Sequence, residues 1–500
     1  MGRLDPPLEA NPSVAIIGAG FGGLGMGYYL KKAGLDNFTI FEKKHGVGGT
    51  WRENTYPGAA CDIASHLYSF SFEPHYPWSC RYGHQHEILA YQEHVAQKHG
   101  LARHIQFGRE MAGATFDEAR GLWTIRFTDG STHEARVLVS AVGQLHRPQI
   151  PDLPGIDSFQ GRAFHSARWD HDFDMKGRKV AVVGTGASAV QFVPEIAKDV
   201  EKLTVFQRTA GWCVPKFDRR YSRFERWLLT NVPFLHDLDR LRIFWWVEYL
   251  FTAWRKDSFL RPTSLAIGRT GAKLLMRLQV KDPKLREKLT PNFPLGCKRL
   301  LLSNDWLAAL ARPNVEVVTE AIASITPTGV KTADGREHAV DAIVYGTGFE
   351  ATKFLAPMDL KGIGGASLQQ QWAHGAQAYL GVGVSGFPNF YVLYGPNTNL
   401  GAGSIIFMLE RQQRFVTKLV QKLKRESLAA LDVKADAQKR YNDFLQSKNP
   451  DFVYEDGCNS WYLTEGRNTN NWLGYMWEYD RLLDKPRFED FVAVPSRVAA

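Results

Sequence analysis

Two glycine-rich turns, each between an apolar run and a helix-like pattern, constrain this 500-residue chain most. The first turn lies in VAIIGAGFGGLG and the second in VAVVGTGASAVQ. In that context a G-x-G-x-x-G motif predicts a dinucleotide site. The glycines let the backbone approach a pyrophosphate, and the helix N-terminus presents free N–H groups to it. The predicted contacts are Gly18, Gly20 and Gly23 in the first turn and Gly184, Thr185, Gly186 and Ala189 in the second.

The residues that follow the two turns carry opposite charges. Glu42 lies twenty-four residues after Gly18, and Arg208 lies twenty-four residues after Gly184. A carboxylate at this position accepts hydrogen bonds from ribose hydroxyls, whereas an arginine can hold a 2′-phosphate. The first site therefore suits FAD or NAD and the second suits NADPH. A single motif of this kind can also be a tight turn without a ligand, but two copies with opposite end charges favour two nucleotides.

The order of the patterns predicts an α/β fold with two Rossmann-like dinucleotide-binding domains, one inserted into the other. We expect residues 1–148 to form the first part of the FAD-binding domain. Residues 149–347 would form the NADPH-binding domain, with a helical insertion at about 218–291. Residues 348–500 would return to the FAD-binding domain and add a C-terminal segment.

Charge and composition exclude several other classes. The net charge is +9, and residues 201–300 hold 21 lysines and arginines against 9 acidic residues. This basic segment fits a phosphorylated nucleotide. We predict no nucleic-acid partner, because there is no basic tail and no zinc-finger spacing. No C-x-x-C pair occurs, which argues against a zinc ribbon or a dithiol redox centre, and we predict no metal site.

The most hydrophobic stretch, LRIFWWVEYLFTAW, is too short and too charged to span a membrane, although contact with a membrane surface stays open. No secretory signal is visible at the N-terminus, so we expect a cytoplasmic protein.

The segment between the two nucleotide units contains FQGRAFHSARWD. Its pattern F-x-G-x-x-x-H-x-x-x-W-D resembles the fingerprint of type I Baeyer–Villiger monooxygenases, in the class B flavoprotein monooxygenase family. The fingerprint residues are Phe159, Gly161, His165, Trp169 and Asp170. Other segments, among them GGTWRENTYPGAACD, GCKR, GTGF and NSWY, also resemble the family, from about Ser13 to Leu483.

The resemblance implies a mechanism. NADPH would reduce FAD, and the reduced flavin would trap O2 as a C4a-peroxide that attacks a ketone carbonyl. Rearrangement would insert one oxygen atom next to the carbonyl and give an ester or lactone. The protein would have to hold an anion and exclude water.

The resemblance also implies roles for individual residues. Arg299 of GCKR would stabilise the anionic peroxide and adduct, and Asp62 would position that arginine. Lys298 and Thr209 would join Arg208 at the 2′-phosphate of NADPH. The remaining cofactor contacts would be Thr50, Trp51, Tyr68, Gln144 and, at the nicotinamide end, Trp461.

Plainer interpretations of some of these residues stay open. Arg299 could be a surface cation, Asp62 a helix N-cap, and Trp461 a packing residue. We expect His165 to fix the linker between the domains by hydrogen bonds rather than to act as a general base.

The substrate and the competing functions complete the expectations. GPNTNLGAGSIIFMLE is more similar to family branches that act on linear or bulky ketones, so we expect O2 and such a ketone as substrates of a monomer or homodimer. The alternative enzyme is an N- or S-oxygenating flavin-containing monooxygenase. A disulfide or quinone reductase would need a cysteine pair or a quinone site. A catalytically silent nucleotide-binding protein is disfavoured, because Asp62, Lys298 and Arg299 are all present.

Overall fold

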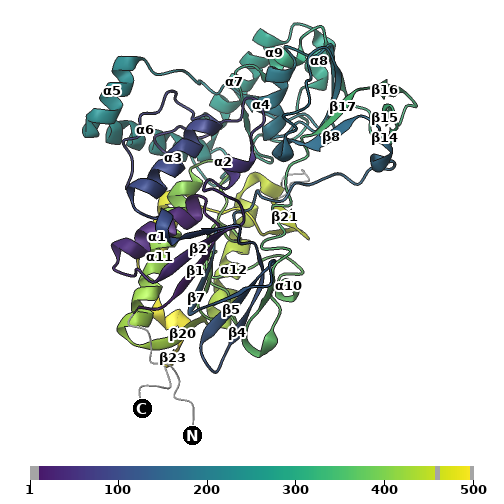
Figure 1. Ribbon diagram of the computed structural model, residues 1–500. Helices are drawn as coiled ribbons and strands as arrows, with labels where there is room; N and C mark the ends of the chain where they lie inside the picture. Colours follow the sequence, from purple (N-terminus) through teal and green to yellow (C-terminus); the bar gives the residue numbers. More distant parts are fainter. Residues whose placement is uncertain (1–10, 456–461, 496–500) are drawn as a thin grey trace.

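The computed structural model describes residues 11–455 and 462–495 and contains two parallel five-stranded sheets. The first sheet, in the lower half of Figure 1, has the order β19-β7-β1-β2-β3. Its strands are β1 (Val14–Ile17), β2 (Phe38–Glu42), β3 (Ile105–Phe107), β7 (Val137–Ser140) and β19 (Phe390–Val392). Strands β1 and β7 are buried on both faces, which explains why they are continuous apolar runs rather than alternating patterns. The pairing of β19 with β7 shows that the chain returns to the first sheet after it has built the second one.

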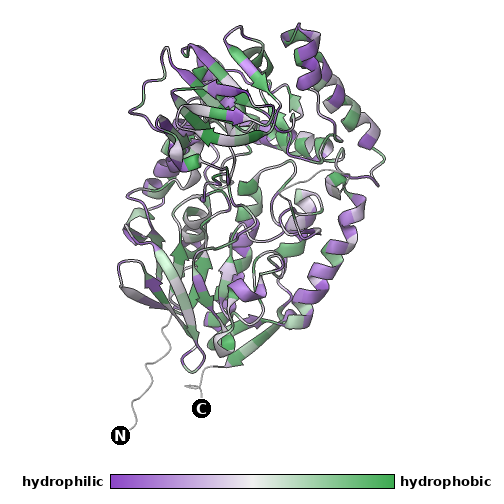
Figure 2. Ribbon diagram, turned by 90° about the vertical axis from the view of Figure 1, so that its right-hand side faces the viewer, coloured by the Kyte–Doolittle hydropathy of each residue, from purple (hydrophilic) through white to green (hydrophobic). Residues whose placement is uncertain are grey.

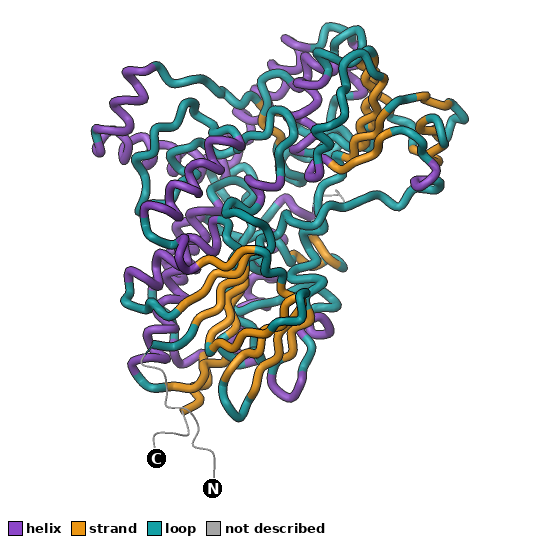
Figure 3. Tube along the Cα trace, in the orientation of Figure 1, coloured by secondary structure: helices purple, strands orange, loops and turns teal. Residues whose placement is uncertain are grey.

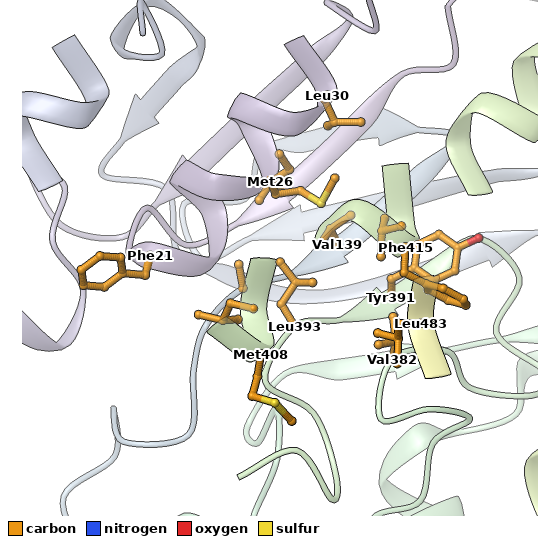
Figure 4. Close-up of a cluster of buried hydrophobic side chains, with 14 of the residues drawn as sticks. Phe21, Met26, Leu30, Val139, Val382, Tyr391, Leu393, Met408, Phe415 and Leu483 are labelled. Carbon is orange, nitrogen blue, oxygen red and sulfur yellow. The ribbon is translucent and has the colours of Figure 1, made fainter. Parts of the chain in front are cut away.

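Helices α1 (Phe21–Lys32) and α11 (Ile405–Arg425) pack together against this sheet. Ser404 begins α11 as its N-cap, with its hydroxyl accepting a hydrogen bond from the backbone N–H of Phe407. Figure 4 shows Met26 and Leu30 of α1 gathered with Tyr391 of β19 and other buried side chains in the core beneath these helices. This packing fixes the start of α1, and therefore the first glycine-rich turn, at the carboxyl edge of the sheet.

The second sheet, at the upper right of Figures 1 and 3, has the order β13-β10-β9-β17-β8. Its strands are β8 (Arg162–His165), β9 (Lys179–Val183), β10 (Lys202–Phe206), β13 (Val315–Val318) and β17 (Ala342–Tyr345). Helix α4 (Ala187–Ile196) follows β9 directly and packs with α9 (Trp306–Leu310) over one face. The fingerprint segment, which we expected in a linker, partly forms the edge strand β8 instead, paired in parallel with β17.

Three smaller sheets, built mainly from antiparallel pairs, were not expected from the sequence. One combines β4 (Met111–Asp117), β5 (Leu122–Phe127), β6 (Thr132–Ala135) and β18 (Asp359–Lys361), with β18 parallel to β4. Another is formed by β14 (Ile322–Thr326), β15 (Gly329–Thr332) and β16 (Glu337–Ala339). The third pairs β20 (Leu428–Val433) with β23 (Phe491–Pro495) and so joins the end of the described chain to the strand that follows α11.

The expected helical insertion contains α5 (Arg223–Asn231), α6 (Pro233–Phe251), α7 (Arg261–Gln279) and α8 (Pro283–Lys288). In Figure 2 the sheet strands are mostly green, whereas outer helices mix green and purple along their length. No helix in the described ranges has the length and apolar character needed to cross a membrane. The expectation of a mixed α/β fold with two Rossmann-like sheets is confirmed; the domain limits themselves stay a proposal.

Candidate active site

One cavity of about 1950 Å³ is lined by both glycine-rich turns. Its walls include Gly18 and Glu42 from the first sheet, Gly184 and Arg208 from the second, and Arg299 between them. The carboxyl ends of strands from two parallel sheets therefore open into one space, which is where α/β folds bind their ligands.

The first glycine-rich turn has almost no room for side chains. Gly18 has φ +105°, and a Cβ there would lie 2.7 Å from the carbonyl oxygen of Ala141. A Cβ on Gly23 would lie 1.9 Å from the carbonyl oxygen of Gly18, so α1 can approach β1 only with glycine at this position. Gly20 lies beside Gly49, whose own Cβ would be 3.3 Å from the Cα of Gly20. The first glycine-rich turn and the turn that contains Gly49 together present backbone without side chains to the cavity. This is the surface that a pyrophosphate requires.

Glu42 ends β2 with a fixed carboxylate. Its side chain accepts hydrogen bonds from the backbone N–H of Ala19 at 2.8 Å and of Lys44 at 2.9 Å, and the residue is only 6% exposed. It also lines the cavity, and each carboxylate oxygen has a further acceptor position for a ligand. The geometry fits the predicted contact with an unphosphorylated ribose.

The other residues predicted at the first nucleotide lie around the same wall. Thr50 and Trp51 are in the short helix α2 (Thr50–Glu53), and the Trp51 indole donates to the Tyr68 hydroxyl at 3.2 Å. The Gln144 amide donates to the carbonyl of Tyr394 at 2.9 Å. All four side chains line the cavity.

The second turn repeats the geometry of the first with one difference. Gly184 has φ +102°, and a Cβ there would be 2.6 Å from the carbonyl oxygen of Gly346. Gly186 and Thr185 line the cavity, and the Thr185 hydroxyl donates to the carbonyl of Thr209 at 3.5 Å. Ala189 is buried in the third position and packs toward Gly346, whose missing side chain leaves space for its methyl group.

Arg208 and Lys298 form the cationic end of the cavity. Both line it, and Lys298 lies 4.9 Å from the centre of the Phe293 ring. Burial, and then the charge of Arg208, lower the pKa of Lys298. Two cations that repel each other are relieved when an anion binds between them, which fits a phosphate group.

Arg299 and Asp62 form an ion pair and a hydrogen bond within the cavity wall. Their side chains stay 37% and 26% accessible, and this accessible surface faces the cavity. The charge of Asp62 raises the pKa of Arg299 in spite of burial. Burial alone would raise the pKa of Asp62, but the charge and hydrogen bond of Arg299 hold that pKa below its ordinary value. Both groups therefore stay ionised at neutral pH, and Asp62 is not the helix cap that we considered.

Comparison with known proteins agrees with this geometry. The model of the family "Flavin-binding monooxygenase-like" matches residues 11–229. A Baeyer–Villiger monooxygenase of Pseudomonas aeruginosa is 42% identical over 95% of this chain and 90% of its own length. The chain belongs to the Baeyer–Villiger monooxygenases.

Two solved structures of that family share the fold. An oxidised steroid monooxygenase bound to NADP is 30% identical, with a TM-score of 0.86 over 97% of this chain and 100% of the other. The monooxygenase OTEMO in complex with FAD and NADP is 27% identical, with a TM-score of 0.84 over the same shares.

In this Baeyer–Villiger monooxygenase, residues that the sequence did not point to hold the loop that carries Asp62. Gln191 of α4 accepts hydrogen bonds from the Tyr56 hydroxyl at 2.9 Å and the Ala60 N–H at 3.3 Å, and it donates to the Ala60 carbonyl at 2.8 Å. The loop that carries Asp62 is thus attached to the helix that follows the second glycine-rich turn. Tyr56 and Ala60 lie inside the motif that suggested the family, but no local pattern points to Gln191 as their partner.

Buried asparagines hold the opposite wall. Asn399 donates to the Asn471 side-chain oxygen at 2.6 Å and accepts from the Tyr394 hydroxyl at 2.8 Å. Asn470 donates to Gln144 at 3.3 Å. The repeated asparagines of GPNTN and NTNN were the available sequence signal for this network. Trp461 lies outside the described residues.

The fingerprint histidine of this Baeyer–Villiger monooxygenase does not line the cavity. His165 is buried, its Nδ1 accepts from the Ala167 N–H at 3.1 Å, and its ring packs edge-on to Phe349. Burial lowers the pKa of His165 to about 4, so the ring is neutral at pH 7. Nearby, Arg168 donates to Glu53 at 2.8 Å, which connects the fingerprint to α2. Within the described residues, no group of three or more His, Cys, Asp or Glu side chains is placed to hold a metal ion.

Proposed function

We propose that this Baeyer–Villiger monooxygenase uses Arg299 and Asp62 to oxygenate a bulky or linear apolar ketone. The overall reaction takes ketone, O2, NADPH and a proton to ester or lactone, NADP⁺ and water. One oxygen atom enters the bond between the carbonyl carbon and its neighbour, and the other leaves as water. The observation that carries this proposal is the ion pair of Arg299 with Asp62 in a cavity shared by two nucleotide-binding turns.

The residues present fit both cofactors. The bare backbone of Gly18, Gly20 and Gly49 and the fixed carboxylate of Glu42 suit the pyrophosphate and ribose of FAD. The cationic end at Arg208 and Lys298 suits the 2′-phosphate of NADPH. When bound, FAD supplies the redox chemistry that takes electrons from NADPH and activates O2.

Arg299 supplies the permanent positive charge that the reaction needs. Negative charge develops on oxygen as the ketone is attacked, and a fixed guanidinium facing the cavity stabilises that charge without reorganising. A preorganised donor of this kind lowers a barrier by about 3–4 kcal/mol. Asp62 holds the guanidinium in one orientation and, because both groups stay ionised, neither has to gain or lose a proton.

The walls on the insertion side suit an apolar substrate. Ile243, Val247 and Leu250 of α6 line the cavity, and Ile267, Gly268 and Gly271 of α7 line it as well. The aliphatic side chains exclude water from this side. We therefore expect linear or bulky ketones to enter more readily than small polar ones.

A product assay tests the function directly. The purified protein, supplied with FAD and NADPH, is offered linear, cyclic and steroidal ketones and a thioether, and the products are identified by mass spectrometry. We expect esters or lactones from ketones, with NADPH oxidation stimulated by substrate. Sulfoxide as the only product, with ketones unchanged, would support the N- or S-oxygenating alternative instead.

A further inference from the structure

The helical insertion exposes an unusual number of large apolar side chains. It lies at one side of the molecule, with α5 at its outer edge in Figure 1. The half-exposed or more exposed side chains on and around α5–α7 are Phe217, Phe224, Trp227, Phe234, Leu238, Leu241, Trp245, Phe259, Leu274 and Leu278. Scattered apolar residues are normal on a surface, but a group of this size indicates an interaction site.

Helix α6 is apolar on two opposite faces. Phe234, Leu238, Leu241 and Trp245 recur at intervals of three and four residues and form an outer stripe; Phe234 is 70% exposed and Trp245 is 55% exposed. Ile243, Val247 and Leu250 line the cavity and lie about half a helical turn away from the stripe. The inner face is explained by the cavity. The outer face has no such explanation, because an exposed helix normally presents polar residues to water.

Basic side chains flank the apolar ones. A groove of about 590 Å³ along α7 is lined by Lys256, Arg261, Arg269 and Lys273, with the apolar Leu265 and Ala266 between them. Phe259, at the start of α7, is 87% exposed beside this groove. Arg223 and Arg226 of α5 and Arg242 of α6 are also exposed, and Arg242 pairs with Asp239. Aromatic and aliphatic side chains bordered by lysine and arginine are the composition of a helix that lies in a membrane interface.

We propose that α5, α6 and α7 dock on an anionic lipid surface. The outer stripe of α6 would enter the boundary between headgroups and acyl chains, and the basic groove of α7 would bind lipid phosphates. A second copy of the chain fits less well, because a twofold dimer would bring the same basic surface against itself, whereas an anionic leaflet attracts it. Here cations stand next to the apolar side chains.

Docking would also explain where the substrate comes from, a consequence that rests on the proposed function. The inner face of α6 lines the cavity while its outer stripe would touch lipid, so one helix separates the bilayer from the site. An apolar ketone dissolved in the membrane would then reach the cavity over a short path, past Trp246 and Ile267, which line the cavity and are half exposed.

Vesicle binding tests docking independently of catalysis. The FAD-loaded protein is sedimented with phosphatidylcholine vesicles that contain or lack phosphatidylserine, at low and high salt. We expect binding only to the anionic vesicles, weakened by salt, because attraction to the leaflet is electrostatic. No sedimentation with anionic vesicles at low salt would overturn the proposal.

Variants locate the surface. F234S/W245S should weaken vesicle binding at least about 10-fold, and each of K256Q, R269Q and K273Q should weaken it about 5-fold. The matched control is F444S, which changes a phenylalanine of α12 (Ala435–Lys448) that is 49% exposed and far along the chain from the insertion. The control should bind like the parent protein, and equal losses in the control and the stripe variant would overturn the proposal.

Light scattering on the same proteins separates lipid from a second copy. FAD content and circular dichroism first establish that each variant is folded. If the parent chain is a dimer that F234S/W245S converts to a monomer, the stripe is a subunit interface and the lipid proposal fails. If the variant keeps the parent's oligomeric state and FAD content but loses vesicle binding, the proposal stands.

Discussion

At the end of β2 the chain presents a buried carboxylate, whereas just after β10 it presents an exposed guanidinium. Glu42 is held by two backbone N–H groups beside a turn that is almost wholly enclosed. Arg208, Gly186 and Ala187 are exposed, and the second turn opens to solvent. Two turns with the same backbone geometry thus sit in different surroundings.

The difference indicates that the two sites bind and release their ligands at different rates. A site whose recognition groups are fixed and enclosed before the ligand arrives favours slow release, because little ordering remains to be done on binding. An exposed cationic end favours fast, salt-dependent capture of an anionic ligand. The enclosed site suits a cofactor that stays bound, and the open site suits one that enters and leaves in each turnover.

The largest effect is expected at Arg299, which lines the cavity between the turn beside Glu42 and the turn beside Arg208. Arg299→Ala should lower ester formation by about 10²–10³-fold, because it removes the guanidinium that we propose stabilises the developing oxygen anion. Both nucleotide ends should be untouched, so NADPH-dependent flavin reduction, followed by stopped-flow absorbance, should continue. Arg299→Lys, which keeps a charge but loses the two-pronged geometry, should recover only part of the rate. Near-parental ester formation by Arg299→Ala would show that the arginine has another role.

A pair of reciprocal changes tests how closed the first turn is. Gly23→Ala would place a Cβ 1.9 Å from the carbonyl oxygen of Gly18, so it should destabilise the protein by about 1–3 kcal/mol and release FAD. Ala189→Gly, at the same place in the second turn, should leave FAD in place and cost about 1 kcal/mol. Thermal unfolding with FAD fluorescence measures both. Equal effects would mean that the two turns do not differ as described.

The exposed site around Arg208 should discriminate between NADPH and NADH. Arg208→Ala should raise KM for NADPH by about 10- to 100-fold and leave that for NADH nearly unchanged, since a hydrogen bond to a charged group contributes about 1.5–3 kcal/mol. The control is Arg178→Ala, an exposed arginine that precedes β9 at the end of the strand opposite Gly184. Steady-state kinetics with NADPH and with NADH measures the two KM values. Equal increases in both would contradict a contact between Arg208 and the 2′-phosphate of NADPH.

The smallest effect is expected at Glu42, the buried carboxylate beside the first glycine-rich turn. Glu42→Gln keeps the shape of the side chain but replaces charged hydrogen bonds with neutral ones, a loss of about 1 kcal/mol. FAD affinity, measured by titrating the apoprotein, should fall about 5-fold, and KM for NADPH should stay constant. A larger change in KM for NADPH than in FAD affinity would contradict the assignment of Glu42 to the FAD site.

The parts of this fold that depend on local pattern could be predicted, and the parts that depend on distant partners could not. The glycine turns, the strands around them and α11 have signatures within a few residues. Strand β8 has none, because Arg162 and Ala163 are exposed and leave no apolar run. The hairpin of β4 and β5 did have a signal, the alternation in LWTIRF, which our sequence analysis did not use.

The candidate site divides in the same way. The resemblance brought Arg299 and Asp62 together across 237 positions of sequence, and the structure places them in contact. Gln191 was missed, because a side-chain hydrogen bond between segments far apart in the sequence leaves no periodic trace. Tyr394 and Asn399 lie only five residues apart, and the repeated asparagines around them were a signal that went unused.

The side-chain amide of Gln191 connects α4 to the loop that carries Asp62. It sits one turn along α4 from Gly186, and it holds Ala60, two residues before Asp62. A shift of α4 on binding of a dinucleotide would therefore move the backbone beside Asp62. Under the proposed function, binding of the electron donor and orientation of the Arg299 guanidinium would then be linked through this side chain.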